Sequence, residues 1–550
     1  MATNDISQKE IIAHYEATSL KDMAGASHRL AGDALLVTVQ GEICRLPVPS
    51  NDPNDPLNFT RWEKAAIIVA CCWFSIMSLA LSGGLGAILS TFFQIYLPQG
   101  HSTEEIVRLL TFPALFIGVG NYIILPMSLA FGRRPVFILS VVILLAATIG
   151  SAVQNSYEAH LATRIIQGLA TGATESLLPL MLTDITFLHE RSKIFGFYWA
   201  TQNIFSSGLN IASSYETSIN WRLYYWVYVA AIGLGLLLVI FGAFETRFAR
   251  PLSSLSGQVV YTDNYGVTRI LSDEEAQAHL PTSPAITTYS SAPPKKTYSQ
   301  MLRPWSGSAP RPARLIIMSW IHMAESFTSP GILYAVLLSS ITLGCTIGIS
   351  LTYNTVLENN YGWPAENVGL INIGGIIGGI VGMLYGGWPA DRLVIYLAKR
   401  NHGIHKPEHR LIMLILPGFL GVGSLLLYGF TASGGSTWWG PYIGWTLFQV
   451  VFVTVLIVST TFAAEAWPKN PGPAIVVVVG SKNLISFGAS YGITPMVTEH
   501  GYPWALGVLA AIFGAIFLLG VPVYFWNPKW RAYVARKEEE HRELGVGTTT

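Results

Sequence analysis

Long apolar runs recur along this chain, and polar stretches of very unequal length separate them. A transmembrane helix needs about 20 mostly apolar residues. Twelve runs meet that requirement, near 65–95, 107–130, 135–154, 159–185, 194–216 and 221–244, and then near 330–353, 367–389, 410–431, 438–463, 474–496 and 503–526. The pattern predicts an all-α membrane protein with twelve transmembrane helices in two six-helix halves.

The polar segments predict how the chain is divided. The interval between the two sets of runs is rich in Ser, Thr and Pro, as in LPTSPAITTYSSAPPKK, and such a segment cannot bury enough apolar surface to fold alone. Its last part, 313–327, is apolar enough to lie along a membrane surface. The expected parts are a cytoplasmic tail at 1–60, a first half at 61–244, a cytoplasmic linker at 245–328, a second half at 329–526 and a cytoplasmic tail at 527–550.

Lys and Arg placement predicts the orientation, because cytoplasmic loops of membrane proteins are enriched in these residues. Nearly all of them fall in cytoplasmic segments if both termini are cytoplasmic. The loop after the second run, LAFGRRPVF (129–137), and the loop after the eighth, GGWPADRLVIYLAKR (386–400), are basic turns at the same place in each half. Paired halves of this kind suggest a rocking transporter with a central site.

Composition excludes several other classes. Hydrophobic residues make up 51% of the 550 residues and charged residues only 12%, about half the share of a soluble domain. The balance of 33 Lys and Arg against 32 Asp and Glu gives no basic field for nucleic acid. The chain has no Walker motif for a nucleotide, no Cys/His cluster with metal spacing and no nucleophile–base pair. We therefore expect no enzyme activity and no cofactor or metal.

Ionisable residues inside the bilayer are costly, so each one is a candidate functional residue. Arg164 and Glu175 lie on the fourth run, eleven residues apart, which returns to the same face of a continuous helix. A carboxylate removed from water binds protons more readily, so Glu175 is the first candidate for proton coupling or cation recognition. A structural hydrogen bond is the alternative for Glu175, and an interhelical lock is the alternative for Arg164. Asp184 is expected in a structural cluster with His189, Glu190 and Arg191.

Polar side chains also recur at helical spacing in several runs. A stripe of amides and hydroxyls in a membrane faces either a partner helix or a wet cavity. Lys482 is the other costly charge, and it either binds an anionic group, pairs with Glu465 or reaches the inner interface. Tryptophans such as Trp438, Trp439 and Trp504 are typical of interfacial belts. The candidate cavity residues are Gln202, Asn203, Ser206, Asn210, Tyr334, Thr346, Gln449, Lys482 and Asn483.

Several motifs together resemble one family. RIIQGLATG (164–172) resembles the fourth-span motif of the major facilitator superfamily. The longer run TESLLPLMLTDITFLHER (174–191) resembles the fungal twelve-span drug:proton antiporter group, which includes yeast-type polyamine and cation carriers and pumps for secondary metabolites. NWRLYYWVY, FETRF, GGWPADRL, KPEHRL and GSKNLISFGASYG (480–492) extend the similarity over most of residues 55–530.

The resemblance implies alternating access driven by a proton gradient, usually at the plasma membrane. By position, Arg164 matches an arginine linked to proton transfer, and Glu175 matches an acidic residue of the fungal subgroup. Asp391 and Arg392 match a loop motif that locks one conformation, and Arg133 and Arg134 remain from its first-half copy. That copy normally reads GxxxDRxGRR, whereas Leu129 and Ala130 stand here in place of Asp and Arg.

The fifth-span antiporter motif also departs from the family. It is normally rich in glycine and ends in Gly-Pro, but it reads QNIFSSGLNIASS here. The expectation is a proton-coupled transporter of a small organic molecule, with efflux of a drug-like or secondary metabolite favoured. Proton symport of an organic cation or nutrient is the alternative, and a transport-dead membrane sensor is a minor one. The expected partners are the substrate, protons and the lipid bilayer, and a monomer suffices for this fold.

Overall fold

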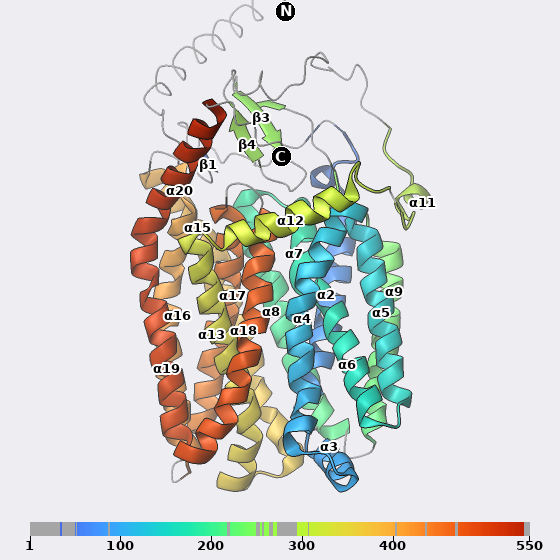
Figure 1. Ribbon diagram of the computed structural model, residues 1–550, viewed down its shortest axis with the longest axis vertical. Helices are drawn as coiled ribbons and strands as arrows, with labels where there is room; N and C mark the ends of the chain where they lie inside the picture. The colour runs from blue at the N-terminus through green and yellow to red at the C-terminus, as the bar shows by residue number, and fades with distance from the viewer. Residues whose placement is uncertain are drawn as a thin grey trace, which may run out of the picture.

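Helices account for most of the chain in the computed structural model (Figure 1). The structure describes residues 34–35, 50, 52–85, 89–216, 220–248, 253–255, 258–262, 268–271, 294–305, 307–401, 404–434, 437–467 and 471–543. Among these residues, eleven helical segments are long and apolar enough to cross a membrane. The predicted fifth span, α8, is a 26-residue helix outside those eleven, and it carries the amides and serines noted above.

The helices of the first half begin and end close to the predicted spans. Capping boxes fix two of the starts, with Thr60 and Glu63 at one helix and Ser102 and Glu105 at another. The elements are η1 (Pro56–Asn58), α2 (Arg61–Gly83), α3 (Leu89–Tyr96), η3 (Leu97–Gln99), α4 (Thr103–Phe131), α5 (Arg133–Val153), α6 (Tyr157–Thr171), α7 (Ala173–Asp184), η4 (Leu188–Glu190), α8 (Arg191–Glu216) and α9 (Trp221–Gly242).

The second half repeats this arrangement with more irregular turns. Ser329 caps one helix by accepting a hydrogen bond from the Ile332 N–H, and Pro330 stands at its first position. The elements are α11 (Tyr298–Met301), α12 (Pro312–Ser326), α13 (Pro330–Thr355), η5 (Val356–Asn360), η6 (Ala365–Asn372), α14 (Ile373–Gly386), α15 (Trp388–Arg400), η7 (Pro407–Leu414), α16 (Ile415–Ala432), α17 (Trp439–Ala466), α18 (Pro471–His500), α19 (Tyr502–Leu518) and α20 (Gly520–Glu543).

Short strands occur in the tail and the linker. In the N-terminal tail, β1 (Ala34–Leu35) pairs antiparallel with β5 (Ile404–His405), which follows α15. In the linker, β2 (Ser253–Leu255), β3 (Gln258–Thr262) and β4 (Thr268–Leu271) form an antiparallel sheet in that order. Much of the segment predicted as a linker lies outside the described residues.

Two predicted spans are interrupted rather than continuous. The first run, predicted at 65–95, contains α2 and the separate short helix α3. The fourth run breaks at Gly172, between α6 and α7. A Cβ atom on Gly172 would lie 2.7 Å from the carbonyl carbon of Gly120 on α4. The two backbones therefore approach at a distance that only glycine permits, and this contact lies where the helix breaks.

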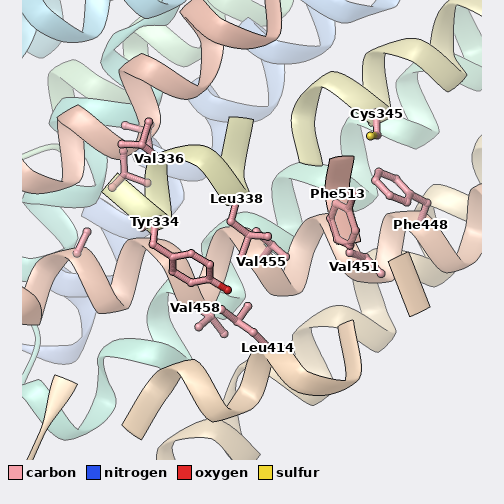
Figure 2. Packing of buried hydrophobic residues seen from close by; sticks show 14 of the residues in the cluster. Tyr334, Val336, Leu338, Cys345, Leu414, Phe448, Val451, Val455, Val458 and Phe513 are labelled. Carbon is pink, nitrogen blue, oxygen red and sulfur yellow. The ribbon is translucent and has the colours of Figure 1, made fainter. Parts of the chain in front are cut away.

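Buried apolar side chains form two clusters. One cluster contains side chains from all the helices between α2 and α9. It also contains Val453, Leu456 and Ile457 of α17. The other joins α13 to α20 and also takes in Leu125, Leu129 and Leu180 of the first half. Figure 2 shows part of the second cluster, where side chains of α13, α17 and α19 pack together. The halves thus share apolar contacts along α17 and along α4 and α7.

Helix α12 crosses one end of the bundle (Figure 1). It covers almost all of the run that was expected to lie along a membrane surface. It packs against α4 and α18, and Trp320 Nε1 donates a hydrogen bond of 2.9 Å to the Tyr122 carbonyl of α4. Hereafter this end of the bundle is the α12 end, and the end near α3 is the α3 end.

Candidate functional site

A cavity of about 270 Å³ lies between the two halves. Its walls come from α2, α4, α7 and α8 of the first half and from α13, α17 and α18 of the second. Helix α2 contributes its last turn and α13 its second part, so the cavity extends from Glu175 toward the α3 end. The walls are mainly apolar, with side chains such as Leu343, Ile347, Phe452 and Phe487. Such a cavity suits a small organic ligand.

An ion pair between the halves lies in the wall of this cavity. Lys482 Nζ of α18 lies 2.6 Å from Glu175 Oε1 of α7, and both side chains are at least 95% buried. Two amides, those of Asn483 and Asn121, donate to the other carboxylate oxygen, Oε2; the Asn121 bond measures 3.3 Å. The interpretation of Lys482 as a partner of Glu465, or as a residue at the inner interface, was therefore wrong.

Trp199 of α8 lies beside this pair. Its ring centroid is 5.8 Å from Lys482 Nζ, a distance at which the ring face attracts a cation. Its indole N–H donates a 3.3 Å hydrogen bond to Thr460 Oγ1 on α17, which holds the ring in place across the two halves. The ammonium of Lys482 therefore contacts a carboxylate and an aromatic ring.

Three polar side chains of α8, which we call the polar row, line the cavity: Gln202, Ser206 and Asn210. They repeat every four residues and so share one face of the helix. Ser206 Oγ and Asn210 Oδ1 are buried without a hydrogen-bond partner. Asn203 also lines the cavity, but its Nδ2 donates to the Gly375 carbonyl of α14 at 2.9 Å. The polar row presents hydrogen-bonding groups to the cavity.

Arg164 lies eleven residues before Glu175 and bonds to other groups. A one-residue turn at Gly172 separates their helices α6 and α7, which together form one 28-residue span. Arg164 is fully buried and donates to the carbonyls of Leu109, Leu81 and Ser82 and to the Gln167 amide oxygen. These bonds connect α6 to α4 and to the end of α2, which is the interhelical lock weighed above.

Three of the predicted cavity residues lie outside the cavity lining. Tyr334 packs among apolar side chains of the second cluster (Figure 2), and its hydroxyl donates to the Phe517 carbonyl at 3.5 Å. Thr346 bonds the Thr342 carbonyl within its own helix at 2.9 Å. Gln449 packs closely on Gly378 of α14. Helical spacing identified a polar face in each case, but neighbouring helices cover that face.

The basic residues of the first loop bond within the first half, and we call them and their acidic partners the first-half cluster: Arg133, Arg134, Asp184 and Glu245. Arg133 Nε lies 3.3 Å from Asp184 Oδ2, and the Arg133 and Arg134 N–H groups donate to the Glu245 carboxylate. The Arg134 guanidinium donates to the Ile240 and Ala243 carbonyls at the end of α9. Asp184 thus pairs with Arg133, and its charge also acts on Arg191, a member of the cluster predicted for it.

Next to it, Arg247 donates to the Ala130 carbonyl at 3.1 Å and to the Gly307 carbonyl at 2.8 Å. Burial lowers the pKa of Arg247, and the neighbouring Glu245 opposes this effect. Thr246 Oγ1 donates to Asp184 Oδ2 at 2.9 Å. The FETRF segment (244–248) therefore connects the first loop to α7 and to the linker.

The corresponding second-half cluster contains Asp391, His405, Arg410 and Glu465. Arg410 makes two hydrogen bonds of 2.6 Å with the Glu465 carboxylate, and His405 Nε2 lies 2.9 Å from the same group. This cluster also reaches the first half. Asp391 Oδ2 accepts from the Lys193 N–H at 3.1 Å, and Arg410 donates to the Ser192 hydroxyl.

Arg392, the fourth predicted lock residue, contacts the first turn of its own helix. Its guanidinium carbon lies 3.5 Å from the centroid of the Trp388 ring, and the side chain is exposed. Among the described residues no ion pair joins it to an acidic residue, and the bonds to α8 come from Asp391 and Arg410. Of the two lock residues predicted in this loop, Asp391 bonds to the other half and, in the part of the chain that the structure describes, Arg392 does not.

Two side chains around the ion pair, Asn121 and Trp199, are absent from the residues predicted for the site. Asn121 stands alone in the apolar run GVGNYIIL, and a lone buried amide is a signal of the same kind as those used for α8. Trp199 falls in the middle of α8, whereas belt tryptophans lie near helix ends. The position of Trp199 within the helix, away from its ends, was therefore the signal that could have identified it as a candidate functional residue.

The comparisons agree with this architecture. A model of the Major Facilitator Superfamily matches residues 65–481, and the chain belongs to this superfamily. It is a multi-pass integral membrane protein and a secondary transporter, and it is not an enzyme. Members of the family move small molecules coupled to ions.

Two fungal relatives and one solved structure illustrate the similarity. An uncharacterized MFS-type transporter of Schizosaccharomyces pombe is 23% identical over 536 residues, which cover 91% of each chain. The efflux pump radE of Floropilus chiversii is 22% identical, over 88% of this chain and 84% of the relative. The structure of the proton:xylose symporter XylE covers 86% of this chain and 97% of its own, with 16% identity and a TM-score of 0.55. At that identity the likeness concerns the fold.

Proposed function

We propose that this chain is a proton-coupled transporter of a small organic molecule that works by alternating access, with Glu175 as the proton-binding group. The observation that carries the proposal is the Glu175–Lys482 pair, buried in the wall of the central cavity and joining the two halves. A buried carboxylate and ammonium on different halves form a charge pair that a proton can break. Binding of that proton is then coupled to the relative position of the halves.

Protonation of Glu175 would remove the negative charge that holds Lys482. Lys482 would then lose its anionic partner, and Glu175 would keep its amide contacts as a neutral acid. The energetic link between α7 and α18 would weaken as a result. Because a buried pair with one neutralised partner is strongly destabilised, this single event supports a conformational change.

The topology that we propose has twelve spans, with α8 counted as the fifth. Its polar row explains its low hydropathy, since one face of α8 borders the cavity instead of lipid. We propose cytoplasmic termini, because the basic loops then lie on the cytoplasmic side. The proposed parts remain a tail, two halves, a linker and a second tail with the boundaries given above. A monomer in the plasma membrane is the proposed working form.

Two directions of transport are proposed. Export of a drug-like or secondary metabolite comes first, since relatives such as radE carry the name of efflux pumps. Import by proton symport is the second candidate, and the specific observation that favours it is the charge pair itself. If a proton binds one residue of the Glu175–Lys482 pair and the substrate binds the other, the protein can hold the proton and the substrate at the same time.

The test is transport by Glu175→Gln in sealed vesicles at two external pH values. The variant keeps the size of the side chain and its amide contacts but carries no titrating group. We expect transport that no longer changes with the proton gradient. Glu158→Gln on the exposed start of α6 is the matched control and should behave like the native chain. Unchanged pH dependence in Glu175→Gln would remove Glu175 from the mechanism.

A further inference from the structure

We infer that the substrate presents an anionic oxygen, such as a carboxylate or an ionised hydroxyl, to Lys482. This inference deepens the proposed function and rests on it for the location of the substrate. It concerns which member of the charge pair is available to a ligand. The question is decided by the hydrogen bonds that each side chain already makes.

Glu175 has little remaining capacity to bind a cationic substrate. Its Oε1 accepts from Lys482 at 2.6 Å, and its Oε2 accepts from the Asn483 and Asn121 amides. A carboxylate has about four acceptor positions, so a substrate ammonium would have one lone pair of Oε1 left, next to the like charge of Lys482, unless it replaced one of these donors. If it replaced Lys482, the displaced ammonium would remain buried without a carboxylate, which costs several kcal/mol.

Lys482 has unused donor capacity. An ammonium carries three N–H donors. Among the described residues Lys482 donates to one acceptor, Glu175 Oε1, and its Nζ also lies 5.8 Å from the Trp199 ring centroid. The side chain is 98% buried, yet it lines the cavity. An oxygen of the substrate would therefore complete the coordination of Lys482 without displacing any existing donor.

The polar row provides an independent indication of a ligand with hydrogen-bonding groups. Gln202 is 92% buried and lines the cavity, and its side chain makes no hydrogen bond within the part of the chain that the structure describes. Ser206 Oγ and Asn210 Oδ1 follow at successive turns, also without partners. Buried polar groups are normally satisfied. A ligand that extends along α8 from Lys482 toward the α3 end would satisfy them, with its apolar surface against Leu343, Ile347 and Phe487.

This arrangement determines how the proton and the substrate influence each other. Protonation of Glu175 frees Lys482, so it should strengthen the binding of an anion and weaken that of a cation. By linkage, the anion should strengthen proton binding by the same factor. Proton and anion then move together, which is the second of the two proposed directions.

The experiment measures the binding of three small probes of similar size to the full purified chain in lipid nanodiscs. Benzenesulfonate is anionic and has no titrating group in the pH range used, benzylammonium is cationic and benzyl alcohol is neutral. We expect benzenesulfonate to bind most tightly. Its affinity should rise about 5- to 150-fold between neutral and mildly acidic pH, the usual range of coupling between two ligands.

Variants of the pair identify the anchoring group. Lys482→Met should weaken benzenesulfonate about 10- to 100-fold, the expected loss of one charge-assisted hydrogen bond. Glu175→Gln should bind it as tightly at neutral pH as the native chain does in acid. Since Lys482→Met leaves Glu175 unpaired and can impair folding, the uncharged double variant Glu175→Gln/Lys482→Met is the second test. It should fold and should discriminate little between benzenesulfonate and benzyl alcohol.

Two results would overturn the inference: tighter binding of benzylammonium by the native chain, or a preference for benzenesulfonate that persists in the double variant. A different result concerns the proposed function alone. If benzenesulfonate binding depends on Lys482 but not on pH, the anion site stands and Glu175 is not the proton-binding group. The two failures are thus distinguishable.

Discussion

The two basic loops at the α12 end occupy the same place in each half, yet they bond in different ways. The first-half cluster makes its ion pair and carboxylate contacts inside the first half, where Arg133 pairs with Asp184 and both arginine N–H groups bind Glu245. The second-half cluster reaches across to α8 through Asp391 and Arg410. One loop holds its own half together, and the other also joins the halves.

The first loop has an apolar residue at one acidic position of the family motif. Leu129 stands where the family motif has Asp, and it belongs to an apolar seal formed with Leu125 and Leu180. These three side chains are buried in the apolar cluster of the second half, and Leu125 and Leu180 lie against Gly472 near the start of α18. The α12 end is therefore closed by polar bonds beside α8 and by apolar contact beside α18. Equivalent positions can thus close the same end by different physical means.

The largest expected effect comes from the ion pair inside the second-half cluster. Glu465→Gln leaves the buried Arg410 without its bidentate partner, so the free energy of unfolding should fall by about 3–5 kcal/mol. Denaturation of the purified protein in detergent measures this loss. The double variant Glu465→Met/Arg410→Met should recover part of the stability, because it removes both charges of the pair, while Asp391 loses its contact with Arg410. A double variant as unstable as the single one would contradict this explanation.

A smaller effect is expected in the apolar seal. Leu129→Ala removes buried surface and leaves a cavity, at a cost of about 2–3 kcal/mol, near the low end for a buried leucine. Part of this cost should appear as separation of the halves at the α12 end. Spin labels on the exposed residues Phe197 of α8 and Tyr396 of α15 report that distance. If the variant loses stability without a longer distance, Leu129 supports folding alone.

The polar contact between the halves should respond more weakly. Asp391→Asn weakens the bond to the Lys193 N–H and the contact with Arg410, which should cost about 1–2 kcal/mol. The same pair of spin labels should show a shift toward longer distances, with unfolding little changed. A combined Leu129→Ala and Asp391→Asn variant should show both losses, since they act on separate parts of the closure.

The smallest effect is expected at the neighbouring cation. Arg392→Gln removes an exposed guanidinium that lies on Trp388 within the same helix, so stability should change by less than about 0.5 kcal/mol. The spin-label distance should stay as in the native chain. If Arg392→Gln instead opened the α12 end as far as Asp391→Asn, the role implied by the family motif would apply to this arginine after all.

The sequence predicted the membrane class because hydropathy alone specifies it. A helix in lipid must form all its backbone hydrogen bonds internally and expose apolar side chains. Each span therefore appears in the sequence as a run of consecutive apolar residues. The predicted runs agree with the observed helices to within a few residues at most ends. They differ inside some runs, as at Gly172, where a turn interrupts the helix at a close contact with Gly120 on another helix.

The candidate residues show the same contrast. A buried charge such as Glu175 or Lys482 is conspicuous in an apolar run, so both were found from the sequence. Their mutual contact was not, because 307 residues separate them and the sequence left an anionic group, Glu465 and the inner interface as alternatives for Lys482. Tyr334, Thr346 and Gln449 were chosen by helical spacing, which shows that polar residues share a face but not which helix covers that face.

The sequence by itself determined the apolar spans, the costly buried charges and the polar row of α8, because these depend on residues near one another in the chain. Only the tertiary structure decided that Glu175 pairs with Lys482, that Arg164 binds backbone carbonyls, and that Asp391 rather than Arg392 bonds across the halves. Those outcomes depend on which helices approach closely enough for a hydrogen bond, and the approach is set by contacts between distant segments, such as Gly172 on Gly120 and Gly387 near Gly196.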